Sequence, residues 1–65
     1  MPYVHMRVTR EGVTRKQKAL LIAGVTDLLV RVLKKQPAQT FVVIEEVGTD
    51  NWGVGGKPVT ALRYL

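Results

Sequence analysis

TRKQKALLIAGVTDLLVRVLKKQP, residues 14–37, is the stretch that decides the fold of this chain. Its apolar side chains recur three and four residues apart, which is the spacing of one helix face. They are Leu21, Val25, Leu28, Leu29, Val32 and Leu33. Thr14 and Gln17 match a capping box, in which each side chain satisfies the other residue's backbone N–H. The pattern predicts a helix of about twenty residues that ends at Gln36-Pro37.

A strand is predicted on each side of this helix. Residues 3–9 alternate, so that Val4, Met6 and Val8 share an apolar face and the residues between them share a more polar one. Residues 40–47 are apolar enough in their first half to be buried on both faces. A strand, a helix and a strand form a βαβ unit, whose two strands are parallel and whose crossover is right-handed in nearly all cases.

The glycines after residue 47 predict turns rather than a third long element. Residues 48–51 are expected to form a turn, and the WGVGG stretch at 52–56 a glycine-rich loop or short hairpin. Residues 57–65 carry apolar side chains at regular intervals and are expected to dock on a neighbouring subunit. The whole chain, residues 1–65, is therefore predicted to be one α/β domain, a βαβ unit with a short C-terminal hairpin.

The length of the chain, 65 residues, is too small for a sizeable core of its own. A chain of this size buries only ~60% of its unfolded surface. It has no cysteine, so disulfides and thiolate metal sites are excluded, and one histidine cannot hold zinc alone. Yet 46% of its residues are hydrophobic, which points to subunit interfaces. Because two strands and one helix cannot close a core, two units are expected to pair into a four-stranded sheet backed by two helices.

The net charge of +5 and the pI near 10.1 raise the question of a nucleic-acid partner. The basic residues are scattered, however, and the few aromatic residues are not interleaved with them as a stacking platform requires. The charge fits attraction of small anionic substrates better. No signal region and no apolar run of membrane-spanning length is present, so a cytoplasmic protein without a membrane partner is expected.

Pro2 is the most informative single residue, because it stands directly behind the initiator methionine. Methionine is usually trimmed before a small residue, and the chain would then begin with a prolyl secondary amine. An α-amino group titrates near ~7.7–8 in the absence of perturbation. Burial and nearby cations lower this pKa, because both disfavour the charged form. Pro2 is thus a candidate general base for use near neutral pH.

Other familiar catalytic motifs are missing. The glycine cluster does not open a helix and lacks the GxGxxG spacing, which excludes a dinucleotide site of that type. There is no serine to serve as a nucleophile. Glu45 and Glu46 are neighbours on a strand and face opposite ways, so they cannot form a carboxylate pair within one chain. His5, on the more polar face of its strand, is interpreted as a structural or interface residue.

The order of these features closely resembles the 4-oxalocrotonate tautomerase family. Its most specific pieces are Met1-Pro2, the helix start at residues 14–18 and the turn at residues 52–56, and the resemblance covers nearly the whole chain. It implies an enzyme without a cofactor or metal, in which the N-terminal proline moves a proton along a conjugated keto or enol acid. It also implies a trimer of βαβ dimers whose active sites are shared between subunits, with a lone trimer as the lesser alternative.

The resemblance also assigns roles to single residues. Pro2 would be the catalytic base and acid, and Trp52 falls where the family commonly has an aromatic wall residue that lowers the local polarity. Well-known members carry one arginine just before the helix cap and a second early in the second strand. This chain has Val13 and Phe41 there.

Another arginine must therefore bind the substrate carboxylate and polarise its carbonyl. Arg10 is the first candidate, since the loop before the helix is one residue longer here and brings it close. Arg7 in the first strand and Arg63 in the C-terminal segment, reaching from a neighbouring subunit, are the weaker candidates.

Three functions stay open at this point. The leading one is a tautomerase acting on a 2-hydroxydienoate or a related enol acid. The second is a hydratase or hydrolytic dehalogenase of the same architecture, in which protonated Pro2 acts as an acid and a loop carboxylate, Glu11 or Asp50, activates water. The third is a non-catalytic, basic oligomeric binding protein, for which a change at Pro2 would alter no measurable property.

Overall fold

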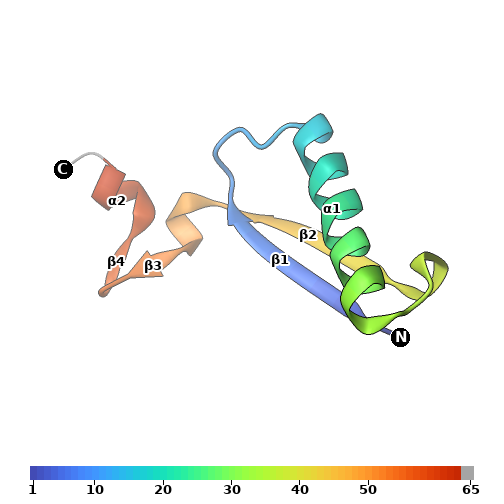
Figure 1. Ribbon diagram of the computed structural model, residues 1–65. Coiled ribbons are helices and arrows are strands. Elements are labelled where there is room, and N and C mark those ends of the chain that lie inside the picture. Colours follow the sequence, from blue (N-terminus) through green and yellow to red (C-terminus); the bar gives the residue numbers. More distant parts are fainter. Residues whose placement is uncertain (64–65) are drawn as a thin grey trace.

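The chain folds as a βαβ unit followed by a small hairpin and a short helix (Figure 1). The computed structural model describes residues 1–63, except for the side chain of Arg63. The elements in chain order are β1 (Tyr3–Thr9), α1 (Arg15–Leu33), the 3₁₀ turn η1 (Pro37–Gln39), β2 (Phe41–Val47), the 3₁₀ turn η2 (Thr49–Asn51), β3 (Gly53–Val54), β4 (Lys57–Pro58) and α2 (Val59–Arg63). This order confirms the predicted α/β class and the C-terminal hairpin.

The ends of α1 are fixed by its caps. Oγ1 of Thr14 accepts a hydrogen bond from the backbone N–H of Gln17 at 3.0 Å, and Oε1 of Gln17 accepts one from the N–H of Thr14 at 2.9 Å. The predicted capping box is therefore confirmed. The helix ends earlier than predicted because Lys34 adopts a left-handed conformation, with φ 59°, and its N–H bonds the carbonyl of Val30 at 3.0 Å.

The strands β1 and β2 lie side by side and run parallel, with Tyr3 opposite Phe41 at the start of the register. Helix α1 covers one face of this two-stranded sheet (Figure 1). Val4, Met6 and Val8 are half-buried, whereas the first residues between them are exposed. The predicted alternation of β1 is confirmed, and β2 shows the same alternation.

The sheet face that points away from α1 is open in the single chain. Tyr3 is 60% exposed, Phe41 48% and Val43 44%. The prediction that the first half of β2 is buried on both faces is wrong for one chain, since one helix can cover only one side of a sheet. We refer to this open side as the outer face. Its exposed aromatic and branched side chains are the kind that subunit interfaces bury.

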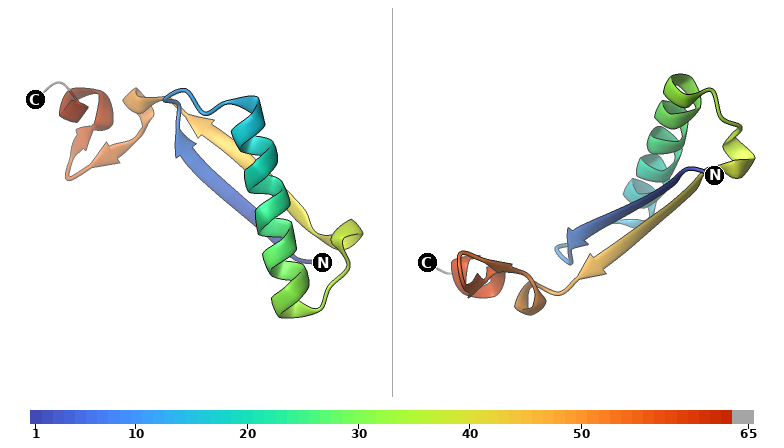
Figure 2. Two further views of the ribbon diagram at one scale, coloured as in Figure 1. Left: turned by 45° about the horizontal axis from the view of Figure 1, so that its top comes forward. Right: turned by 90° about the horizontal axis from the view of Figure 1, so that it is seen from below.

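The hairpin and α2 form a separate small unit beyond the carboxyl ends of the two long strands (Figure 2). The strands β3 and β4 are antiparallel and joined by Gly55 and Gly56, whose φ angles of 60° and 86° favour glycine. Val59 packs behind this turn, and its N–H bonds the carbonyl of Trp52 at 2.8 Å. Its side chain is 8% exposed, and no other hydrophobic side chain in the described residues is buried.

The dimensions of the chain are those of a piece of an assembly. Its extents are 45 × 24 × 14 Å and its radius of gyration is 15.0 Å, whereas a compact domain of this length has about 11 Å. Its accessible surface is 5113 Å², against roughly 4,100 Å² for a folded monomer of the same mass. A lone chain has almost no core, which supports the expectation of an oligomer. The four-stranded sheet formed by two units stays a prediction.

Substitutions at the two caps of α1 are expected to change the free energy of unfolding in opposite directions. Thr14→Ala removes one half of the capping box and is expected to lower the free energy of unfolding by about 1 kcal/mol. Lys34→Gly relieves the left-handed conformation and is expected to raise it, by up to about 1 kcal/mol. Chemical denaturation followed by circular dichroism, at one protein concentration, measures both. Two changes of the same sign would show that the caps do not control the stability of the helix.

Candidate functional site

A cluster of charged side chains lies on the outer face, where β1 and β2 carry residues directly opposite one another. Glu45 faces Arg7 in the parallel register. One oxygen of its carboxylate, Oε1, accepts hydrogen bonds from Nε of Arg7 at 3.0 Å and from Nε2 of His5 at 2.8 Å. These bonds, that from Arg7 above all, lower the pKa of Glu45 below its usual value. The carboxylate is therefore charged at neutral pH.

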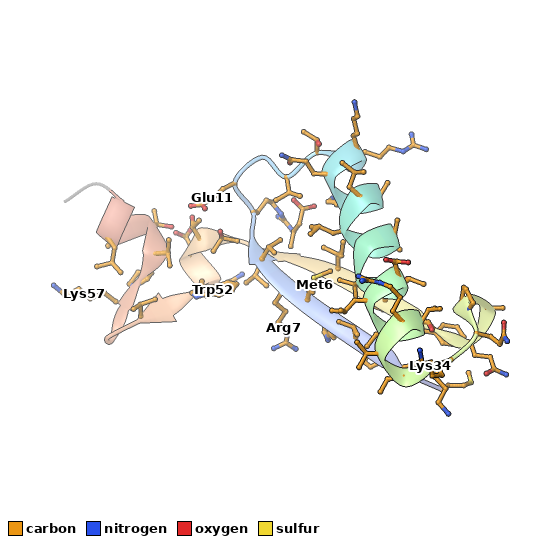
Figure 3. The ribbon with its side chains drawn as sticks, in the orientation of Figure 1. Met6, Arg7, Glu11, Lys34, Trp52 and Lys57 are labelled. Carbon is orange, nitrogen blue, oxygen red and sulfur yellow. The ribbon has the colours of Figure 1, made fainter. Side chains whose placement is uncertain are left out.

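This cluster borders a pocket of about 520 Å³ between the sheet and the hairpin. The pocket is lined by Arg7, Glu45, Val47, Asn51, Trp52 and Gly53. Figure 3 shows Arg7 projecting from the side of β1 opposite to Met6, which points toward α1. The turn η2 carries the chain around the strand end and leaves Trp52 half-buried in the pocket wall. Two residues predicted for the site, Arg7 and Trp52, are thus brought together.

Arg10 lies elsewhere, over the end of β2. Its backbone N–H bonds the carbonyl of Val47 at 2.8 Å, and its Nη2 donates to the carbonyl of Glu46 at 3.4 Å. The side chain of Glu46 points to the helix side, where Nζ of Lys18 lies 2.5 Å from its Oε2. The hydrogen bond from Lys18 lowers the pKa of Glu46, and the charge of Arg10 adds to this effect. Arg10 does not line the outer-face pocket.

Pro2 lies at the other end of the sheet. It is half-buried, and its carbonyl accepts a hydrogen bond from the N–H of Phe41 at 3.0 Å. The seven residues of β1 lie between Pro2 and Arg10, so eight steps of about 3.3 Å place the two roughly 26 Å apart. Pro2 therefore cannot meet Arg10 or Trp52 within one chain. The side chain of Arg63, the remaining predicted site residue, lies outside the described part of the chain.

The charged cluster beside the pocket contains Glu45 and His5, which the sequence does not assign to the site, and of these two Glu45 lines the pocket. The sequence excludes a carboxylate pair of Glu45 with Glu46 and favours a structural or interface role for His5. The two-residue period of the strands is the signal that could have placed Glu45. It puts Glu45 on the same face as Arg7 when the two strands are aligned in register. The register itself is set by the tertiary structure, so the sequence could not supply this pairing.

The described residues also limit other kinds of site. No three histidine, aspartate or glutamate side chains among residues 1–63 come together as metal ligands. In the same part of the chain, no helix has both the length and the apolar character needed to cross a membrane. The candidate site has two parts, the outer-face pocket at one end of the sheet and Pro2 at the other.

Sequence comparison identifies the protein family. The family model described as "Tautomerase enzyme" matches residues 2–62. This chain belongs to the tautomerase family. A probable tautomerase of Dickeya dadantii is 60% identical to this chain over 63 residues, which is 97% of this chain and 94% of that protein. The family resemblance inferred from Pro2, the helix start and the glycine turn is confirmed.

Solved structures agree with this assignment. The crystal structure of DmpI from Helicobacter pylori has a TM-score of 0.91 to this structure, with 42% identity and 98% of each chain covered. A structure from a study of 4-oxalocrotonate tautomerase isozymes of Methylibium petroleiphilum has a TM-score of 0.90, with 27% identity and 97% of each chain covered. The elongated arrangement of hairpin and βαβ unit is therefore shared with proteins solved by experiment.

The two glutamates predict how the stability of the folded chain depends on acid. Both pKa values are lowered in the folded state by hydrogen bonds from Arg7 and Lys18. Their stabilising contribution is therefore complete above the ordinary glutamate value of 4.5 and is lost as the pH falls through the lower folded values. Chemical denaturation across this range is expected to show a smaller loss of stability in the Glu45→Gln, Glu46→Gln double variant. An equal loss in both proteins would contradict this assignment.

Proposed function

We propose that this protein is a cofactor-independent tautomerase that interconverts keto and enol forms of 2-hydroxydienoate-type or related enol acids, with the N-terminal amine of Pro2 as general base and acid. The observation that carries the proposal is the family match over residues 2–62, which begins at Pro2. Its backbone is held at the start of β1 by the hydrogen bond to Phe41. Tyr3, the next residue, is paired with Phe41 in the strand register, so two aromatic residues lie at this end of the sheet.

The chemistry requires one group that alternately accepts and donates a proton. Removal of Met1 frees the secondary amine of Pro2. In its neutral form the nitrogen takes a proton from an enol oxygen or from a carbon next to a carbonyl. It then returns this proton to another position of the same conjugated system. The proton count balances within the substrate, so no redox partner takes part.

A second copy of the chain completes the site in this proposal. The strand β1 is paired with β2 along one edge, and within the described residues its other edge carries no strand. A two-fold axis through that edge would pair two β1 strands antiparallel and give the four-stranded sheet. Antiparallel pairing places Pro2 of one chain beside the carboxyl end of the partner's β1, where Arg10 follows.

Arg10 and Trp52 then have natural roles beside the partner's Pro2. Arg10 supplies positive charge that stabilises the enolate oxygen as it develops. Trp52 provides the apolar wall of the site. Three such dimers would cover the exposed outer faces of one another, giving a hexamer as the proposed assembly, with a lone trimer as the lesser alternative.

The carboxylates that a hydratase or dehalogenase would need are engaged by threonines. Oε2 of Glu11 accepts a hydrogen bond from Oγ1 of Thr9 at 2.7 Å, and Oδ1 of Asp50 accepts one from Oγ1 of Thr60 at 2.6 Å. Neither residue lines the outer-face pocket. These contacts favour the tautomerase over a reaction in which a loop carboxylate activates water.

Replacement of the proposed base tests the mechanism. Pro2→Ala is expected to lower kcat/KM for phenylenolpyruvate or 2-hydroxymuconate by at least ~10²-fold, because a general base contributes on that scale. Mass spectrometry must show that Met1 is removed from both proteins. Pro37→Ala, in the turn before β2, is the matched control and should retain activity. Full activity of a correctly processed Pro2→Ala enzyme would exclude Pro2 as the base.

The assembly is tested by light scattering. The protein is expected to have six times its chain mass of 7.2 kDa. Val43→Lys places a charge on the outer face and is expected to produce smaller species, because burying an unpaired charge at an interface is unfavourable. Val43→Thr keeps the shape of the side chain and serves as the control. A folded wild-type monomer at micromolar concentration would refute the assembly and, with it, a site shared between chains.

A further inference from the structure

We propose that Lys18 is a positioning residue for the site shared between chains: it holds the carboxylate of Glu46 on the helix side and so keeps that carboxylate from forming an ion pair with Arg10. The inference rests on the proposed function for the role of Arg10 beside the partner's Pro2. The pairing itself lies within one chain and can be measured without turnover. Neither Lys18 nor Glu46 lines the outer-face pocket.

The Lys18–Glu46 ion pair joins α1 to β2 on the covered side of the sheet. Nζ of Lys18 lies 2.5 Å from Oε2 of Glu46, and the two side chains are 33% and 25% exposed. Lys18 stands in the first turn of α1, where its backbone N–H bonds the carbonyl of the cap residue Thr14 at 3.0 Å. The cap thus fixes the place from which the ammonium group reaches β2. A pair that is covered to this degree is screened by water less than an exposed one.

Glu46 offers the guanidinium of Arg10 two different acceptors. In the structure Nη2 of Arg10 donates to the backbone carbonyl of Glu46 at 3.4 Å, which is long for such a bond. The carboxylate of the same residue is the stronger acceptor, because it is charged and can accept two parallel N–H groups. The backbone of Arg10 is fixed by its bond to the carbonyl of Val47 at 2.8 Å. The choice between the two acceptors is therefore made by the side chain alone.

Lys18 determines which acceptor Arg10 uses. The hydrogen bond from Lys18 lowers the pKa of Glu46 most, whereas partial burial acts in the opposite direction. Without Lys18 the carboxylate would need another cation, since an unpaired charge is unfavourable where water is partly excluded. Arg10 is that cation, because its charge already acts on Glu46. Such an ion pair would neutralise the positive charge that the developing enolate oxygen requires.

Lys18→Met tests the inference, because it removes the charge and keeps most of the length of the side chain. In the assembled protein it is expected to lower kcat/KM for phenylenolpyruvate by roughly tenfold, the scale of one hydrogen bond to a charged group. Lys18→Arg keeps the charge and is expected to lose much less activity. Lys16→Met removes the same charge from an exposed position in the same turn of α1 and is the matched control. It should retain activity.

A second substitution separates positioning from a purely structural role. Glu46→Gln, added to Lys18→Met, removes the carboxylate that would pair with Arg10 and is expected to restore most of the lost activity. A structural role predicts no recovery, because the double variant also lacks the ion pair. In an Arg10→Ala background, Lys18→Met is expected to cause no further loss, since it acts through Arg10. If Lys18→Met does not assemble, Lys18→Gln replaces it in each comparison, with the same expected recovery.

Carbon-13 NMR of the Glu46 carboxylate follows the pairing without turnover. In the Lys18→Met protein the pKa of Glu46 is expected to stay below its usual value, because Arg10 now pairs with it. Adding Arg10→Ala is expected to raise this pKa. A pKa of Glu46 that does not respond to Arg10→Ala in this background would show that the two side chains do not pair.

The results keep the inference and the proposed function apart. Wild-type activity of an assembled Lys18→Met protein, no recovery on adding Glu46→Gln, or the absence of the pKa response would each overturn the positioning role. Full turnover in Pro2→Ala or in Arg10→Ala would instead refute the proposed function or the part of Arg10 in it. The pKa response of Glu46 does not depend on turnover and still tests the pairing in that case.

Discussion

The packing of α1 against one face of the β1–β2 sheet is the contact on which the rest of the structure depends. One helix covers one face, so Tyr3, Phe41 and Val43 remain exposed on the other. A single chain with 46% hydrophobic residues and one buried hydrophobic side chain among those described has little to hold it together alone. We therefore expect association to be part of folding for this protein and its stability to depend on protein concentration.

The same constraint governs the candidate site. Pro2 and the outer-face pocket lie at opposite ends of β1, so one chain holds both halves of the site without joining them. The hairpin that carries Trp52 stands beyond the strand ends, where it contacts little of its own βαβ unit. In the assembly that we propose, antiparallel pairing joins Pro2 of one chain to the Arg10 end of the next. Folding, assembly and catalysis would then share one set of contacts.

Two adjacent glutamates show how the strand geometry separates charges. Glu45 points to the outer face and is held by Arg7 and His5, whereas Glu46 points to the helix side and is held by Lys18. Each carboxylate has a lowered pKa for its own local reason. Because the networks lie on opposite sides of the sheet, Glu46 joins β2 to α1 through Lys18, while Glu45 joins β2 to the side chains of Arg7 and His5 in β1.

The sequence by itself determined the elements of this protein, since their signals are local. The helical period, the capping box at Thr14 and the glycine turn each depend on residues a few positions apart, and the alternation in β1 fixes which side chains share a face. The resemblance carried by Pro2 and the WGVGG turn identified the family. Only the tertiary structure decided which distant residues meet. It fixed the register that sets Arg7 opposite Glu45, turned Arg10 away from that pocket and set Pro2 at the far end, because these positions depend on packing between strands separated by the whole length of α1.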